Sequence, residues 1–132
     1  MSDAFVRRAQ IGAALLMASA TVAGAFGAHA LRARLVPGEL ELLHTAVQYQ
    51  FIHALGLLLI GALAERRAQR GLRLAGDLLL VGVLLFSGSL YLLLCGAPRA
   101  IGVLTPIGGA CLIAGWCIAA CALLRRARAT EP

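Results

Sequence analysis

The chain has 132 residues, of which 61% are hydrophobic and only 14% are charged. A soluble domain usually carries a charge on about a quarter of its residues, so this composition excludes a soluble globular domain and a disordered chain. The net charge of +6 comes from 12 arginines and 6 acidic residues, without any lysine. The length fits one domain.

Four apolar segments are long enough to cross about 30 Å of hydrocarbon as helices, which takes roughly 20 residues each. The alternation typical of strands is absent, and a helix satisfies its own backbone in lipid. The sequence therefore predicts an all-α fold, an integral membrane four-helix bundle with up-down topology, as a single membrane domain over 1–132. The expected spans are 9–31, 43–64, 74–95 and 106–124.

The first segment has a second interpretation. Arg7 and Arg8, the apolar stretch after them and the small-residue site around His29 resemble a cleavable signal peptide. The apolar stretch is longer than a usual signal core of about 7–15 residues. We therefore favour a retained membrane span.

The fourth span has two candidate starts. Thr105 is a good N-cap residue, and Pro106 after it fits the first helical position. A start at 106 leaves residues 96–104 as a surface or partly re-entrant loop. The alternative is a longer, kinked helix that starts at Ile101.

The arginines are distributed unequally between the two sides of the predicted bundle. Arg32, Arg34 and Arg99 fall on one side, and the other nine fall on the side of both termini. The positive-inside rule then predicts cytoplasmic termini, with anionic lipid headgroups as partners of the cytoplasmic arginines. The nine arginines on the side of both termini are Arg7, Arg8, Arg66, Arg67, Arg70, Arg73, Arg125, Arg126 and Arg128. No motif indicates nucleic-acid binding.

Polar side chains inside the second and third spans need an explanation, because burying them in lipid costs free energy. One interpretation is interhelical hydrogen bonding, with a neutral His53 bonded to a neighbouring helix; the other is a proton relay or ligand site around His53. Antiparallel packing is expected to place Ser87 near the depth of His53. The candidate polar layer consists of Tyr49, Gln50, His53, Ser87, Ser89 and Tyr91.

Three further groups of residues are candidates for contacts. His29 and His44 flank the first loop near the outer surface and are candidate ligands of a haem or a metal. Asp77 lies one turn after Arg73, which favours an ion pair. Small residues and Trp116 mark helix-packing faces, and the indole N–H should bond to Ser87 or to a backbone carbonyl. The packing set is Gly24, Gly27, Gly88, Thr105, Gly108, Gly109, Gly115 and Trp116.

The four cysteines do not have the spacing of a structural zinc site. Cys95, Cys111, Cys117 and Cys121 all lie in predicted spans and are interpreted as small apolar residues. We therefore expect no cofactor and no structural metal.

Four motifs occur in order along the chain: Gly24-Ala-Phe-Gly-Ala-His-Ala-Leu31, Thr45-Ala-Val-Gln-Tyr-Gln-Phe-Ile-His-Ala-Leu55, Leu85-Phe-Ser-Gly-Ser-Leu-Tyr91, and Leu104-Thr-Pro-Ile-Gly-Gly109 with Gly115-Trp116. Together they resemble the YgdD-like family of small four-span membrane proteins. The resemblance covers nearly the whole chain. It implies a four-helix protein of the bacterial inner (plasma) membrane, with a retained first span and without assigned catalytic activity or catalytic residues.

Three functional hypotheses follow. The leading one is a non-enzymatic structural or interaction component of the membrane, because no catalytic triad, phosphate-binding loop or pair of mid-membrane carboxylates is present. The second is a small oligomeric transporter or channel that uses the polar layer around His53. The third is a haem- or metal-binding redox component that uses His29 and His44. A second copy of the chain and a different membrane protein are both candidate protein partners.

Overall fold

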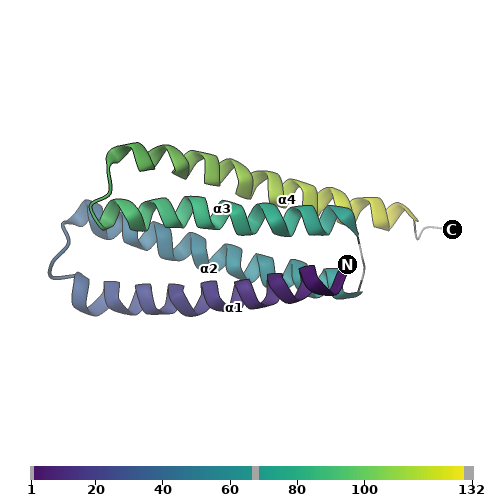
Figure 1. Ribbon diagram of the computed structural model, residues 1–132, viewed down its shortest axis with the longest axis horizontal. Helices are drawn as coiled ribbons and strands as arrows, with labels where there is room; N and C mark the ends of the chain where they lie inside the picture. Colours follow the sequence, from purple (N-terminus) through teal and green to yellow (C-terminus); the bar gives the residue numbers. More distant parts are fainter. Residues whose placement is uncertain (1, 67–68, 130–132) are drawn as a thin grey trace.

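Four long helices run alternately up and down in the computed structural model, which describes residues 2–66 and 69–129 (Figure 1). Helix α1 spans Ser2–Phe26 and continues as a short π-helix η1, Gly27–Leu31. Helices α2 and α3 span Pro37–Arg66 and Arg70–Leu94. A 3₁₀-helix η2, Arg99–Val103, leads into α4, Leu104–Ala129. The all-α, up-down four-helix fold predicted from the sequence is confirmed.

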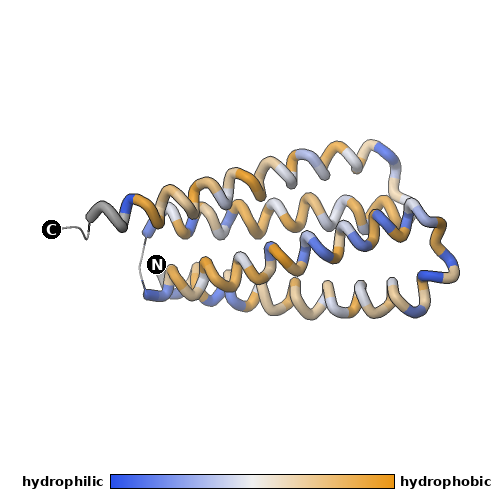
Figure 2. Tube along the Cα trace, turned by 180° about the vertical axis from the view of Figure 1, so that it is seen from behind, coloured by the Kyte–Doolittle hydropathy of each residue, from blue (hydrophilic) through white to orange (hydrophobic). Residues whose placement is uncertain are grey.

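All four helices are long and apolar enough to cross a membrane. The exposed side chains include large apolar ones, and Ile11, Leu15 and Ile113 are 54%, 65% and 68% exposed. Hydrophobic residues predominate along the helices, and the hydrophilic residues lie at the two ends of the bundle and along part of one inner helix (Figure 2). Hydrocarbon is the solvent in which such apolar side surfaces are stable. Val22 and Phe26 of α1 are also exposed.

The helices pack mainly on their neighbours in sequence. Helices α2 and α3 form the central pair, α1 packs on α2, and α4 packs on α3. Within the described residues, the α1 and α4 backbones scarcely approach each other. We call the end with the chain termini and the α2–α3 connection the terminal end, and the opposite one the loop end (Figure 1).

The apolar core lies in the terminal half of the bundle. Its residues come from all four helices and include Phe5, Leu57, Ile60, Leu72, Leu79 and Leu112. Most of the hydrogen-bonded polar side chains lie in the other half, toward the loop end. The terminal half of the bundle is therefore held together mainly by apolar packing, and the half toward the loop end also by hydrogen bonds between helices.

Close backbone contact between α3 and α4 depends on glycine. A Cβ at Gly108 would lie 2.4 Å from the Phe86 backbone nitrogen, and one at Gly115 would lie 3.2 Å from the Ala75 carbonyl oxygen. Gly27 instead leaves space for a side chain of α2, because its Cβ would lie 2.6 Å from Leu43 Cδ2. Small residues that permit such approach are the usual basis of helix association in lipid.

Other expected packing residues behave differently. A Cβ at Gly24 or Gly109 would meet only ordinary van der Waals contacts, at 3.5 and 3.7 Å. Gly88 has nothing within 4 Å of its Cβ position, so the expectation that it packs against another helix is wrong. Periodicity placed Gly88 on a helix face but did not identify what lies opposite that face.

The start of α4 also differs from the expectation. Gly96, at φ +87°, turns the chain after α3, and the 3₁₀-helix over Arg99–Val103 runs directly into α4 at Leu104. Thr105 is therefore the second residue of α4 and not its N-cap. Pro106 is tolerated as the third residue, because the first four backbone N–H groups of a helix have no partner within the helix.

Candidate functional site

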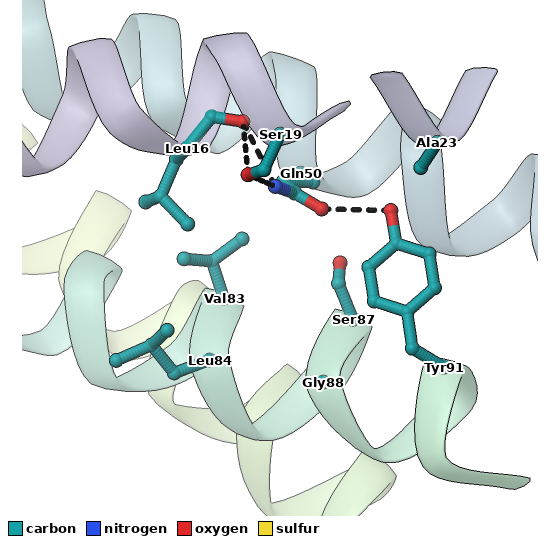
Figure 3. A pocket seen from close by; sticks show the side chains of 9 residues that line it. All are labelled: Leu16, Ser19, Ala23, Gln50, Val83, Leu84, Ser87, Gly88 and Tyr91. Carbon is teal, nitrogen blue, oxygen red and sulfur yellow. Dashed lines mark hydrogen bonds between the residues drawn. The ribbon is translucent and has the colours of Figure 1, made fainter. Parts of the chain in front are cut away.

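Gln50 is the centre of a hydrogen-bond network between α1, α2 and α3. Its side chain is only 4% exposed. The amide nitrogen donates to the Leu16 carbonyl oxygen at 2.8 Å and to Ser19 Oγ at 2.7 Å. The Tyr91 hydroxyl donates to the Gln50 amide oxygen at 2.7 Å (Figure 3). Both amide N–H donors and one acceptor site of Gln50 are therefore satisfied inside the protein.

Two buried serines form further links between helices. Ser87 Oγ donates to the Ala46 carbonyl oxygen at 2.8 Å and so joins α3 to α2. Ser89 Oγ lies 2.6 Å from Thr105 Oγ1, which joins α3 to α4, and 2.8 Å from the Phe86 carbonyl oxygen. Because the Phe86 carbonyl only accepts, a Ser89 hydroxyl that donates to it accepts from Thr105.

His53 lies among aromatic rings and bonds to its own helix. Its Nδ1 is 2.8 Å from the Tyr49 carbonyl oxygen, which only accepts, so Nδ1 carries the proton. The imidazole stacks on Tyr49 with ring centroids 5.6 Å apart, and Trp116 lies 6.3 Å away. Tyr49 also stacks on Phe86 at 4.3 Å. The expected bond from His53 to a neighbouring helix is not what the structure shows.

The six expected polar residues do not form one layer. Gln50 and Tyr91 belong to the α1–α2–α3 network, Ser89 faces α4, and Tyr49 is partly exposed. Ser87 meets Ala46, about two helical turns from His53, so the expected match in depth is wrong. Helix α2 ends at Arg66 and α3 begins at Arg70, so the connection between them is shorter than the one expected between residues 64 and 74.

Trp116 contacts α2 through its ring. A Cβ at Gly56 would lie 2.6 Å from this indole ring, so the ring packs directly over the glycine. In the described part of the chain the indole N–H bonds neither to Ser87 nor to a backbone carbonyl, so both expected hydrogen bonds are absent. The predicted packing role of Trp116 therefore comes from a ring-on-glycine contact.

A groove of about 350 Å³ lies between α1 and α3, with α2 as its floor (Figure 3). Gly88 and the hydroxyl of Ser87 line it. Its polar groups already bond to one another or to the backbone. The groove therefore presents a mainly apolar surface. The lining residues are Leu16, Ser19, Ala23, Gln50, Val83, Leu84, Ser87, Gly88 and Tyr91.

His29 and His44 are both exposed near the loop end. His29 belongs to η1, whereas His44 lines a second groove that does not include His29. Among residues 2–66 and 69–129, no three His, Cys, Asp or Glu side chains are placed to hold a metal ion. The four cysteines are free thiols. No contact in the described part of the chain supports a shared haem or metal ligand set.

Asp77 pairs with two arginines at the terminal end. It forms the expected pair with Arg73, at 4.0 Å, and a second pair with Arg8 of α1. The pair with Arg8 joins α1 directly to α3.

Arg67, one of the predicted cytoplasmic arginines, lies outside the described residues, as do the side chains of Arg126 and Arg128.

Ser19 and Thr105 bond to Gln50 and Ser89, but they are not among the six polar residues expected from the sequence. Ser19 lies opposite Gln50 when α1 and α2 are folded about the short connection between Leu31 and Pro37. Matching residue depth across that connection would have identified it. Thr105 was placed on the packing face, and its hydroxyl contact to Ser89 was not foreseen.

Four helices that are long and apolar enough to cross a membrane define a polytopic α-helical membrane protein. The family model described as a protein of unknown function (DUF423) matches residues 23–109. The chain belongs to this family. Neither the family's description nor the names of the relatives reported below assign an activity.

Curated relatives cover most of the chain. The UPF0382 membrane protein YwdK of Bacillus subtilis is 43% identical over 94 residues, which cover 70% of this chain and 76% of the relative. A UPF0382 membrane protein of Haemophilus influenzae is 41% identical over 93 residues, 70% and 74% of the two chains. The UPF0382 inner membrane protein YgdD of Escherichia coli is 36% identical over 95 residues, 72% of each chain. The resemblance noted from the sequence motifs is thereby confirmed. No solved structure is significantly similar.

Proposed function

We propose that this chain is a non-enzymatic structural or interaction component of the bacterial inner membrane. The observation that carries the proposal is the Gln50 network, in which buried polar groups bond to one another. Groups used in this way fix helix register and orientation. A catalytic or transport site needs polar groups directed at a substrate, and the Gln50 network leaves its groups directed at each other.

The proposed orientation has both termini in the cytoplasm. Arg7, Arg8, Arg66, Arg70 and Arg73 belong to the terminal end, and an excess of arginine favours the cytoplasmic side. Anionic headgroups of that leaflet attract such residues with about 1 kcal/mol for each arginine near the surface. The name of the Escherichia coli relative, an inner membrane protein, supports the same membrane.

Proton flux through reconstituted vesicles tests the proposed function against a transporter that uses His53. We expect vesicles with the protein to lose an imposed pH gradient no faster than empty vesicles, and His53→Leu to leave this rate unchanged. His53 is 8% exposed and held by Tyr49 and Trp116, so water has little access to it. His44→Leu, at an exposed site, is the matched control.

The opposite result has a clear meaning. A flux that depends on the protein, disappears in His53→Leu and persists in His44→Leu would replace the proposed function with a proton pathway.

A further inference from the structure

The second groove lies on the lipid-facing side of the α1–α2 pair, near the loop end. It has a volume of about 630 Å³ and is lined by residues of α1, η1 and α2. Helices α1 and α2 run side by side along one flank of the bundle (Figure 1). Gly24 and Gly27 come from the α1 side, and His44, Val47, Gln48 and Phe51 are among those from α2.

Gln48 lies at hydrocarbon depth. The part of α2 between Glu41 and Glu65 carries no Asp, Glu, Lys or Arg and is centred on His53. Five residues separate Gln48 from this centre, which is about 7.5 Å along the helix. The hydrocarbon extends about 15 Å from its midplane, so Gln48 lies about halfway to the edge. His44 is one turn closer to the surface, where interfacial water reaches it.

The Gln48 side chain is exposed on this groove, and it has no hydrogen-bond partner among the described residues. Gln50, at nearly the same depth, makes three hydrogen bonds. Lipid chains offer neither donors nor acceptors, so an unpartnered amide in the hydrocarbon costs free energy. A protein surface that brings a matching polar group into the groove removes this cost.

We propose that a second copy of the chain docks on this groove and that the two Gln48 amides bond to each other. A two-fold interface brings the same residue of both copies together. Two copies inserted with the same orientation also hold their Gln48 residues at the same depth. A primary amide has both donors and an acceptor and is complementary to itself.

The rest of the groove fits a second copy better than a charged partner. The residues that line it include no Asp, Glu, Lys or Arg. Gly24 leaves the surface low enough for a helix to approach closely, as small residues do at interfaces in lipid. This inference rests on the proposed function, because it names the partner of an interaction component.

The first test measures dimerisation of the full-length chain in liposomes, by single-molecule photobleaching across a series of protein-to-lipid ratios. Interhelical hydrogen bonds in membranes have a measured range that corresponds to about three- to twentyfold in a dissociation constant. We expect Gln48→Leu to raise the dimer dissociation constant within this range. Gln48→Asn keeps the amide and should have a smaller effect.

Gly24→Leu places a bulky side chain at a position that lines the groove. A Cβ at Gly24 is in ordinary contact with Val47, at 3.5 Å, whereas one at Gly27 would clash with Leu43. We therefore expect Gly24→Leu to weaken the dimer and to preserve the helical content. Leu15→Ala is the control and should leave the dimer unchanged, because Leu15 is 65% exposed and lies two and a half turns before Gly24, on the opposite face of α1.

Disulfide cross-linking locates the interface. In a variant with all four native cysteines replaced by alanine, Gln48→Cys should give a covalent dimer on oxidation. Ile113→Cys on α4, 68% exposed, should not. Equal cross-linking at both positions, or a dimer insensitive to Gln48→Leu and Gly24→Leu, would overturn this interface.

A chain that stays monomeric at every protein-to-lipid ratio would also overturn the inference. It would leave the proposed function standing, because that function fails on the separate result that His53→Leu abolishes a protein-dependent flux.

Discussion

At the residue scale, the polar side chains inside the bundle differ in whether they form hydrogen bonds. Gln50 and Tyr91 are bonded to each other across α2 and α3, whereas the Tyr49 hydroxyl has no hydrogen-bond partner among the described residues. Tyr49 instead contributes its ring, which stacks on Phe86 and His53. Removing the hydroxyl of Tyr91, the amide of Gln50 or the hydroxyl of Tyr49 should therefore change the free energy of unfolding by different amounts.

Substitutions in the Gln50 network should lower the free energy of unfolding in proportion to the bonds lost. Tyr91→Phe removes one interhelical bond, so we expect a loss of about 0.6 kcal/mol and at most about 1.7 kcal/mol. Gln50→Leu removes the partner of Leu16, Ser19 and Tyr91 together and should cost more. Unfolding in mixed micelles, followed by circular dichroism, measures both.

Tyr49→Phe is the matched control for Tyr91→Phe and should change the free energy of unfolding only slightly. A loss as large at Tyr49 as at Tyr91 would contradict the hydrogen-bond assignment.

At the scale of elements, α3 and α4 are held together by backbone contact as well as by side chains. Gly108 lies against the backbone of Phe86 and Gly82, and Gly82 in turn leaves space for Leu112. The Ser89–Thr105 contact lies near the loop end of the same interface. This helix pair therefore depends on particular small residues at particular positions.

Gly108→Ala should destabilise the α3–α4 pair, and Gly109→Ala should not. The new methyl group at Gly108 would lie 2.4 Å from a backbone atom that cannot move aside alone. Overpacking of this kind costs about 1–3 kcal/mol. At Gly109 the nearest atom is 3.7 Å away, and alanine favours a helix relative to glycine by up to about 1 kcal/mol.

The midpoint of thermal unfolding in detergent compares the two variants. The α3–α4 geometry would be wrong if Gly109→Ala lowered the midpoint as much as Gly108→Ala.

At the scale of the whole molecule, the terminal end and the loop end differ in charge and in packing. The apolar core and the Asp77 ion pairs lie toward the terminal end. The loop end carries the two short helices η1 and η2. An orientation with the terminal end in the cytoplasm makes a direct prediction about which residues reagents reach from outside.

Cysteine labelling of intact cells tests this orientation. In a variant that keeps only Cys95, which is exposed at the loop end, a membrane-impermeant maleimide should label the protein from outside. In a variant without native cysteines, Arg70→Cys at the terminal end should be labelled only after the cells are permeabilised. The reverse pattern would place both termini outside.

Much of the architecture could be predicted from the sequence. Four apolar runs of about 20 residues have one stable backbone state in lipid, and short connections make neighbouring helices antiparallel. Helical periodicity places Leu15 and Phe26 on the same side of α1, and both are exposed in the structure. It also placed Gly108 and Gly115 on a packing face, which the structure confirms.

The family motifs and the arginine bias are likewise properties of the sequence alone. They do not require knowledge of which residues meet.

Only the tertiary structure decided the contacts. Periodicity shows which residues share a helix face, but the register between helices depends on where the connections end and on how side chains interlock. For this reason the sequence did not exclude a match between Ser87 and His53, a packing role for Gly88 or an N-cap at Thr105. The structure pairs Ser87 with Ala46, leaves Gly88 beside a groove and directs the Thr105 hydroxyl to Ser89.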